Sequence, residues 1–360
     1  MKQLVMEDEP SEIERLEKSL GIEFKHLTAA RKVASIFRQQ LVAKLGGLHS
    51  DDSSIVIFGS LARDEFTAGS DVDWTLLVDG VADPQHLAIA QRVRTVVDDL
   101  EVRKPGREGI FGNMAFSHPI IHQIGGEDDT NRNTTQRILL VLESRPVSRR
   151  GAYDRVLNHI LTRYIEEDPR FLEKSAALHV PRFLLNDFAR YWRTMAVDFA
   201  YKRRTRQGDG AVIRNLKLRM SRKLIFVSGL LVCFSFHLLL NEMQQMGILT
   251  SPKPTTEYVR HLRRLFARTP LEILAAVINR FPHLSDHGAK MFESYNYFIG
   301  TLADESKREH LSRLSIGHES FDPSYLELQA MSHKFRDGLL ELFFDEESGL
   351  SKLTKTYGIF

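Results

Sequence analysis

Strand patterns in this chain are confined to its first 150 residues. Short apolar, β-branched runs bounded by Gly, Asp and Ser occur only there, whereas helical patterns dominate from Tyr153 onward. We therefore predict an α/β head over residues 1–150 and a mostly α-helical second domain over residues 151–360. The length of 360 residues is also in the range of about two domains of ordinary size.

The spacing of apolar residues predicts the individual elements. Residues 11–45 have the period of one or two amphipathic helices, which Gly46 and Gly47 end. The rest of the head is predicted to contain strands at 55–58, 72–78 and 100–103, a strand-like segment at 110–124, and helices at 86–98 and 134–143. The second domain shows helix patterns at 183–201, 216–240, 256–268, 270–280 and 325–344.

Composition limits the classes of protein. The 49 basic and 47 acidic residues nearly cancel, so any basic surface for nucleic acid must be local. The apolar run at 224–240 is at the short limit for a membrane span and contains Ser, Gly and His, so we interpret it as the central helix of the helical domain, with no membrane partner. A single cysteine, Cys233, indicates a reducing compartment, and the N-terminus lacks the order of a signal peptide. We expect a cytoplasmic protein.

The segment 55–78 carries the chemistry. An apolar strand at 55–58 leads into Gly59 and Ser60, where the missing Cβ lets the backbone approach a phosphate and the hydroxyl can donate to it. Arg63 follows one helical turn later, and helix N-termini favour anions. A second Gly-Ser pair ends in Ser70, directly before Asp71 and the next apolar strand.

Asp71 and Asp73 are two residues apart at the start of that strand. Alternate residues of a strand project from the same face, so both carboxylates are expected to point to one place. Two aligned carboxylates repel each other unless a cation lies between them, and Mg²⁺ prefers such oxygen ligands. The pair predicts a site for two Mg²⁺ ions, or Mn²⁺ in their place.

Together, these residues resemble the active-site signature of the polymerase-β-type nucleotidyltransferase superfamily. The resemblance is specific over about residues 55–78 and loose elsewhere. It implies a small mixed β-sheet flanked by helices, a nucleoside triphosphate held by Gly59 and Ser60, and metals held by Asp71 and Asp73. The reaction implied is transfer of a nucleotidyl group to a hydroxyl with release of pyrophosphate.

The family usually has a third carboxylate on a neighbouring strand. The best match is Glu101, between Leu100 and Val102, although it could also be an exposed glutamate at a strand end. The acidic turn at 127–129 competes for the role, but there Asp129 is more plausibly the cap of a helix at 130–143. Close by, His118 could act as a proton shuttle; with His122 it could bind zinc, but buried or surface histidines are favoured.

A local concentration of positive charge occurs at residues 202–223. Arg214 and Lys217 lie on a helix that follows a Gly-rich loop, and a basic helix facing the metal site would neutralise a triphosphate or a nucleic-acid backbone. The stretch 210–215 loosely resembles the glycine-then-arginine turn of bacterial nitrogen-regulatory uridylyl- and adenylyltransferases. A solvated basic face is the alternative.

The acceptor is not readable from the motif, and three functions compete. One is synthesis of a nucleotide signal or short oligomer in bacterial anti-phage defence, because size and layout resemble such enzymes, including Hailong-type nucleotidyltransferases. In that case the partners are ATP or dATP, a single-stranded oligonucleotide product and an effector protein encoded nearby. The others are modification of a regulatory protein, and nucleotide sensing by an inactive head.

The C-terminal segment 351–360 contains two lysines, no acid, and hydroxyls that include Tyr357. A frayed terminus or an edge strand is the plain interpretation. The functional hypothesis is that the tail reaches the metal site and that Tyr357 accepts the first nucleotide. The enzyme would then be its own primer, as the resemblance to Hailong-type enzymes implies.

Overall fold

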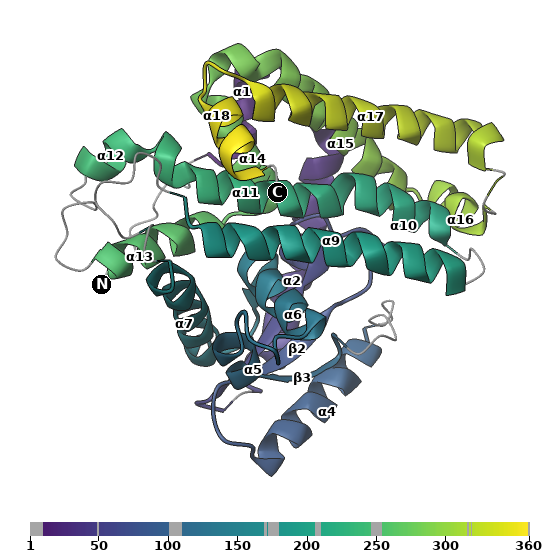
Figure 1. Cartoon of the computed structure of the whole chain (residues 1–360). Coiled ribbons are helices and arrows are strands. Elements are labelled where there is room, and N and C mark those ends of the chain that lie inside the picture. The colour runs from purple at the N-terminus through teal and green to yellow at the C-terminus, as the bar shows by residue number, and fades with distance from the viewer. Residues whose placement is uncertain are drawn as a thin grey trace, which may run out of the picture.

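The structure is a computed structural model that describes residues 10–48, 50–100, 110–168, 171, 180–205, 210–245, 254–314, 317 and 319–358. A small sheet with its flanking helices forms one end of the molecule, and a larger helical body lies above it (Figure 1). The α/β head and the mostly helical remainder predicted from the sequence are confirmed.

Four strands form one mixed sheet in the order β3-β2-β1-β4. The central strand β1 (Ser53–Phe58) is antiparallel to β2 (Trp74–Val78) and to β4 (Ser144–Pro146), whereas β2 is parallel to β3 (Asn113–Phe116). Every residue of β1 and β2 is buried, because helices cover both faces. This explains the continuous apolar runs of the two strands.

The head helices are α3 (Gly59–Ala62), α4 (Pro84–Asp98), α5 (Ser117–His122) and α6 (Asn131–Leu142). The strand-like prediction for 110–124 was half wrong, since β3 ends at Phe116 and α5 begins at Ser117. The strand predicted at 100–103 falls mostly outside the described residues, and Leu100 belongs to the turn after α4. Strand β4 was missed because three residues carry no readable pattern.

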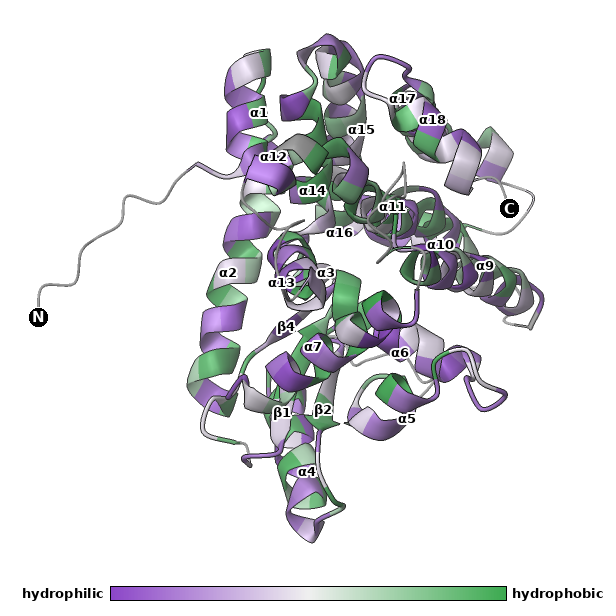
Figure 2. Ribbon diagram, turned by 60° about the vertical axis from the view of Figure 1, so that its left-hand side comes forward, coloured by the Kyte–Doolittle hydropathy of each residue, from purple (hydrophilic) through white to green (hydrophobic). Residues whose placement is uncertain are grey.

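Two N-terminal helices, α1 (Glu12–Leu20) and α2 (Lys25–Leu45), confirm the pattern at 11–45. Ser11 and Glu14 form a capping box at the start of α1, and Gly21 ends the helix in the left-handed conformation. Helix α1 packs on α14 (Pro270–Arg280) and α2 packs on α15 (Ser285–Ala303). Figure 2 shows α2 continuing down beside the sheet, so this helix connects the body to the head.

The helical body confirms the helix patterns predicted after Tyr153. In the part of the chain that the structure describes, no strand follows β4. Its remaining elements are α7 (Gly151–Glu166), α9 (Arg182–Thr205), α10 (Ala211–Lys217), the π-helical turn η1 (Leu218–Arg222), α11 (Lys223–Leu238), α12 (Leu240–Gln245), α13 (Pro254–Phe266), η2 (Pro282–Leu284), α16 (Glu305–Arg313), η3 (Glu319–Phe321), α17 (Pro323–Phe344), α18 (Leu350–Leu353) and the π-helical turn η4 (Thr354–Gly358). The C-terminal segment is therefore helical and not an edge strand.

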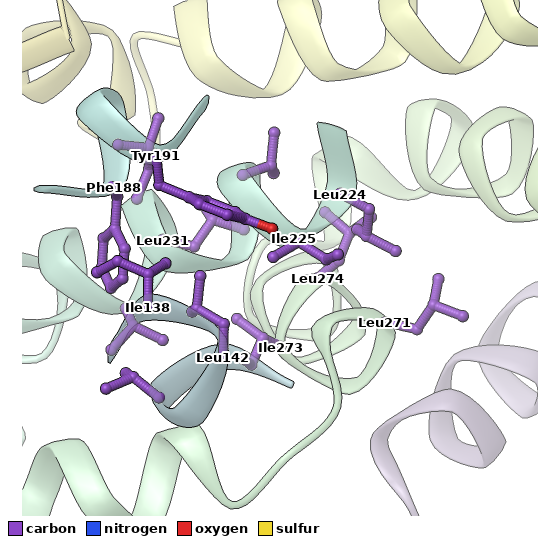
Figure 3. Packing of buried hydrophobic residues seen from close by; sticks show 14 of the residues in the cluster. Ile138, Leu142, Phe188, Tyr191, Leu224, Ile225, Leu231, Leu271, Ile273 and Leu274 are labelled. Carbon is purple, nitrogen blue, oxygen red and sulfur yellow. The ribbon is translucent and has the colours of Figure 1, made fainter. Parts of the chain in front are cut away.

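Helix α11 is the centre of the hydrophobic core. The continuous helix Ala211–Leu238 is long and apolar enough to cross a membrane, but 72% of its most apolar window is buried inside the protein. Figure 3 shows Leu224, Ile225 and Leu231 of this helix among side chains from α6, α9 and α14. This burial supports the interpretation of α11 as a core helix.

One hydrophobic cluster runs from Leu16 to Leu353 and includes residues on both sides of position 150. A smaller cluster lies between β1, β2, α2 and α4. The domain boundary near residue 150 therefore stays a prediction, and the two parts share a core.

Candidate active site

A cavity of about 340 Å³ lies between the head and the helical body, and we call it the central cavity. Ser60, Asp71 and Asp73 line it from the head, and residues of α6, α9, α10, η1 and α15 line the other sides. Eight residues predicted from the sequence meet there, namely Gly59, Ser60, Arg63, Ser70, Asp71, Asp73, Arg214 and Lys217. Residues from sequence-distant helices thus converge on the segment 55–78.

Gly59 places the end of β1 against Asp73. Its φ angle is +67°, in the left-handed region that favours glycine, and a Cβ built on it would lie 3.1 Å from the Asp73 Oδ2 atom. The neighbouring Phe58 N–H donates to the Asp73 carbonyl oxygen over 2.9 Å. Glycine therefore both permits the turn into α3 and leaves room for the carboxylate.

The loop between α3 and β2 is fixed by polar contacts. The Ser70 Oγ atom accepts from the Thr67 N–H over 3.1 Å, and Tyr295 of α15 donates to Glu65 Oε1 over 3.0 Å. Arg308 of α16 donates to Thr67 Oγ1 over 3.3 Å, and a Cβ on Gly69 would collide with its guanidinium. The body thus holds the loop that presents Asp71.

Arg63 is buried and carries two ion pairs. Its guanidinium contacts Glu65, with Nη2 2.9 Å from Oε2, and also Glu143 at the end of α6. The positive charge predicted to meet phosphate is thus shared with two carboxylates, which gives Arg63 a role in positioning the cavity wall. Burial raises the pKa of Glu143, and Arg63 opposes that rise.

The two predicted metal ligands lie among negative charges. Burial, followed by the charges of Asp71 and Glu143, raises the pKa of Asp73 to about 8. A divalent cation between Asp71 and Asp73 would remove this cost, so the donor set fits Mg²⁺. Among the described residues, no group of three or more His, Cys, Asp or Glu side chains forms a metal site.

The third carboxylate predicted at Glu101 lies outside the described residues. Strand β3, which pairs with β2, contains no acidic residue. Asp129 is not the helix cap that we expected, because the Thr130 side chain caps α6 by accepting from the Asn133 N–H. Asp129 instead accepts from Arg137 and Arg190 over 2.9 and 2.7 Å, respectively. It is not a residue of the central cavity.

The facing wall of the central cavity is basic. Helix α10 contributes Arg214 and Lys217, the η1 turn contributes Arg222, and α16 contributes Arg308. Burial lowers the pKa of Lys217 to about 8, although the charge of Asp71 opposes that change. Lys217 is thus close enough to Asp71 for their charges to interact, and the wall can receive a polyanion.

Sequence reasoning missed three residues of the site. Glu65, Glu143 and Arg308 gave no signal because their partners are distant or lack a motif. In the 110–124 segment, Phe111 lines the central cavity and packs against Phe58 with ring centroids 4.9 Å apart, whereas His118 is not among the described lining residues. His118 and His122 lie on α5 with ring centroids 5.0 Å apart.

Tyr357, in η4, packs against the main hydrophobic cluster and is also not among the described lining residues.

Residues 31–105 match the family model described as a nucleotidyltransferase domain. This range runs from within α2 to just beyond α4, so it contains β1, α3, β2 and the loop that carries Asp71. It covers about a fifth of the chain. A search of curated proteins found no match for this chain.

The nucleotidyltransferase domain supports a general nucleotidyl transfer activity and, with it, a nucleoside triphosphate as substrate. All head residues of the central cavity from Gly59 to Asp73 belong to the matched range. A larger cavity of about 590 Å³ between α2, β4 and α13 contains none of the predicted site residues. The central cavity is therefore the candidate active site.

Proposed function

We propose that this protein transfers a nucleotidyl group from a nucleoside triphosphate to an acceptor hydroxyl without a template. The observation that supports this most directly is the central cavity, where Asp71 and Asp73 of the nucleotidyltransferase domain face Arg214, Lys217 and Arg222. A carboxylate pair opposite a basic wall is the arrangement that a metal-bound triphosphate requires. The volume of about 340 Å³ is in the range of small-molecule sites.

In the proposed reaction, the acceptor oxygen forms a bond to the α-phosphorus. The bond from that phosphorus to the oxygen bridging to the β-phosphate breaks, pyrophosphate leaves, and the hydroxyl proton passes to solvent. Asp71 and Asp73 would hold Mg²⁺, which when bound neutralises charge on the transferring phosphate. Lys217 and Arg214 bind the triphosphate tail, and Gly59 and Ser60 let the backbone approach it closely.

The test is transfer of label from each α-³²P nucleoside or deoxynucleoside triphosphate in Mg²⁺, with pyrophosphate release measured in parallel. Asp71→Ala and Asp73→Ala should each abolish transfer, because losing a metal ligand raises the barrier by several kcal/mol. Both variants should remain folded, since each removal relieves repulsion between carboxylates. Turnover by either variant at more than a small fraction of the wild-type rate would overturn the metal assignment.

For the biological role, we propose a cytoplasmic bacterial anti-phage enzyme that makes a nucleotide or DNA oligomer from ATP or dATP. The support is the resemblance of the motif, size and two-part layout to such enzymes. Priming on Tyr357 is part of this proposal, although the tail would have to leave its packing on the helical body to reach Asp73. Label appearing on a separate regulatory protein would favour the alternative, uridylyl or adenylyl transfer to a partner. Binding of triphosphate without turnover would favour a sensing module.

A further inference from the structure

A second hollow of about 980 Å³ adjoins the central cavity, and we call it the α6–α9 groove. Ile110, Thr135, Met195, Asp198 and Lys202 line both spaces, so the two are continuous. The groove extends outward from this shared region along α6 and α9, between the head and the helical body. A molecule lying in it would have one end beside the proposed catalytic centre.

The groove is basic. Its described lining contains four cationic side chains, those of Arg132, Arg190, Arg193 and Lys202, and one acidic side chain, that of Asp198, which forms an ion pair with Lys202. The Arg190 guanidinium is positioned by Asp129, with Nη1 2.7 Å from Oδ2, and Asp129 is itself held by Arg137. Arg132 and Arg193 are exposed. Such a surface favours a chain of phosphates.

Exposed apolar surface accompanies these charges. Tyr201 is 57% exposed and Val197 is 69% exposed, one helical turn apart on α9. Neither side chain contributes to the hydrophobic core, yet both line the groove. An exposed aromatic ring among arginines is the combination that binds unpaired bases, by stacking on the base while cations contact the backbone.

We propose that the α6–α9 groove binds the acceptor, and that this acceptor is a single-stranded nucleic acid whose terminal hydroxyl enters the central cavity. The phosphates of the strand lie along Arg132, Arg190 and Arg193, and a base stacks on Tyr201. Each cycle then lengthens the strand by one nucleotide and releases one pyrophosphate. The proposal rests on the proposed function, because it names the acceptor of that same site.

Binding of a fluorescein-labelled 12-nucleotide DNA or RNA strand, measured by anisotropy with the full chain and no triphosphate, tests the groove. Arg193→Glu should weaken binding at least tenfold and lower its salt dependence. Tyr201→Ala should weaken it severalfold, whereas Tyr201→Phe should not. The matched control is Arg92→Glu, on the exposed face of α4 and outside the groove, which should bind like the wild type.

Three outcomes would overturn the proposal. The first is equal affinity of the Arg193→Glu and Arg92→Glu variants for the strand. The second is that duplex DNA binds as tightly as the single strand and that Tyr201→Ala does not change the affinity for the strand. This result would exclude stacking of a base on Tyr201. The third is an acidic peptide such as poly-glutamate binding more tightly than the strand, which would assign the groove to a protein acceptor. A fluorescent triphosphate should bind the wild type and Arg193→Glu equally.

The same experiment separates this proposal from the one on which it rests. Asp73→Asn should bind the strand like the wild type while failing to extend it. If the wild type binds the strand but transfers no nucleotide to any acceptor, the proposal that the groove binds a strand is kept and the proposed transfer activity is rejected. If the wild type transfers a nucleotide to another acceptor but does not bind the strand, the proposed transfer activity is kept and the groove proposal is rejected.

Discussion

Without a bound cation, Asp73 combines burial with two negative neighbours, Asp71 and Glu143, and its pKa is raised to about 8. A carboxyl group with a higher pKa in the folded state binds its proton more tightly there. Its contribution to stability is fully present below the unfolded pKa, near 3.8, and is lost as the pH rises through about 8. The metal-free protein should thus lose stability over this window.

Asp73→Asn removes this pH-dependent term. We expect the variant to unfold at a temperature several degrees above that of the wild type at pH 8.5 in EDTA, with the difference shrinking toward pH 4. Mg²⁺ should raise the unfolding temperature of the wild type more than that of the variant. Scanning fluorimetry across this pH range checks the expectation, and parallel curves for the two proteins would contradict it.

A second prediction separates a catalytic acid from a structural one. If Glu101 is the third carboxylate, Glu101→Gln should reduce single-turnover transfer severely with little change in stability, because the amide lacks the charge needed to bind metal or draw the acceptor proton. Asp129→Asn should lower the stability of the fold but leave the transfer rate of the folded protein nearly unchanged. Its carboxylate pairs with Arg137, whose side chain is fully buried, and removing one partner of a buried pair costs about 3 kcal/mol.

Chemical denaturation measures the stability of both variants, and rates are normalised to the folded fraction. A larger catalytic loss for Asp129→Asn would move the role of third carboxylate to the 127–129 turn. Asp129 contacts Arg137 and Arg190 and does not line the central cavity, so we do not expect Asp129→Asn to cause the larger catalytic loss.

At the level of single residues, the sequence allowed prediction of side chains that are brought together by residues close in the chain. The spacing of Asp71 and Asp73 predicted that they lie together, because residues two apart on a strand project from one face. Both line the central cavity, although β2 begins only at Trp74 and not at the predicted residue 72. Glu143 could not be predicted, because it meets Arg63 from 80 positions away. No pattern near either residue reports that pairing, and only the folding of α6 onto the sheet creates it.

Among the elements, α10 carries the most direct prediction. Lys217→Glu or Arg214→Glu should raise the KM for triphosphate about tenfold or more, since each replaces a charge-assisted contact by repulsion. The effect should shrink as salt is added. Lys223→Glu is the matched control, because Lys223 begins α11 in the same basic segment but does not line the central cavity.

Steady-state kinetics at two salt concentrations measure these KM values. Unchanged values for both α10 variants would show that the basic face serves only solvation. A similar increase for Lys223→Glu would mean that net charge, and not the position of α10, determines affinity.

Length helped the prediction of single elements but did not decide it. Helices α9 and α17 repeat their apolar spacing often enough to be recognised, whereas the long helices α7 and α15 were not among the predicted ranges. Strands β3 and β4, with four and three residues, are too short for such a repeat. Helix α5 was hidden for another reason, since Pro119 in its first turn looks like a helix breaker although proline is tolerated there.

For the whole molecule, the change from a mixed α/β head to a helical body was predictable, but the packing of the elements was not. Helix α1 packs on α14 more than 240 residues later, and Glu12 N–H donates to Glu272 Oε2 over 2.8 Å. The two amphipathic faces match in character, but many other pairings would match as well. The central cavity exists because such long-range packing brings α10 and α16 to the head.

The position of the C-terminal segment sets the last prediction. Thr354–Gly358 is a π-helical turn after α18, and Tyr357 packs partly buried against the body, outside the described linings of both the central cavity and the α6–α9 groove. Self-priming therefore requires α18 and η4 to detach. If Tyr357 accepts the first nucleotide, intact mass after incubation with triphosphate should rise, with the added mass mapping to Tyr357.

Two variants distinguish a primer from an ordinary terminus. Tyr357→Phe keeps the packing but lacks the hydroxyl, so it should show no added mass while still binding a strand in the α6–α9 groove. Truncation after Gly349 removes both the Tyr357 hydroxyl and the packing of this segment on the helical body. If the groove receives the acceptor end, a separately added strand should be extended by either variant. Wild-type protein of unchanged mass together with accumulating free oligomer would show that Tyr357 is only part of the helical body. An external strand in the α6–α9 groove would then be the proposed primer, since the described residues of that groove line a surface beside the central cavity.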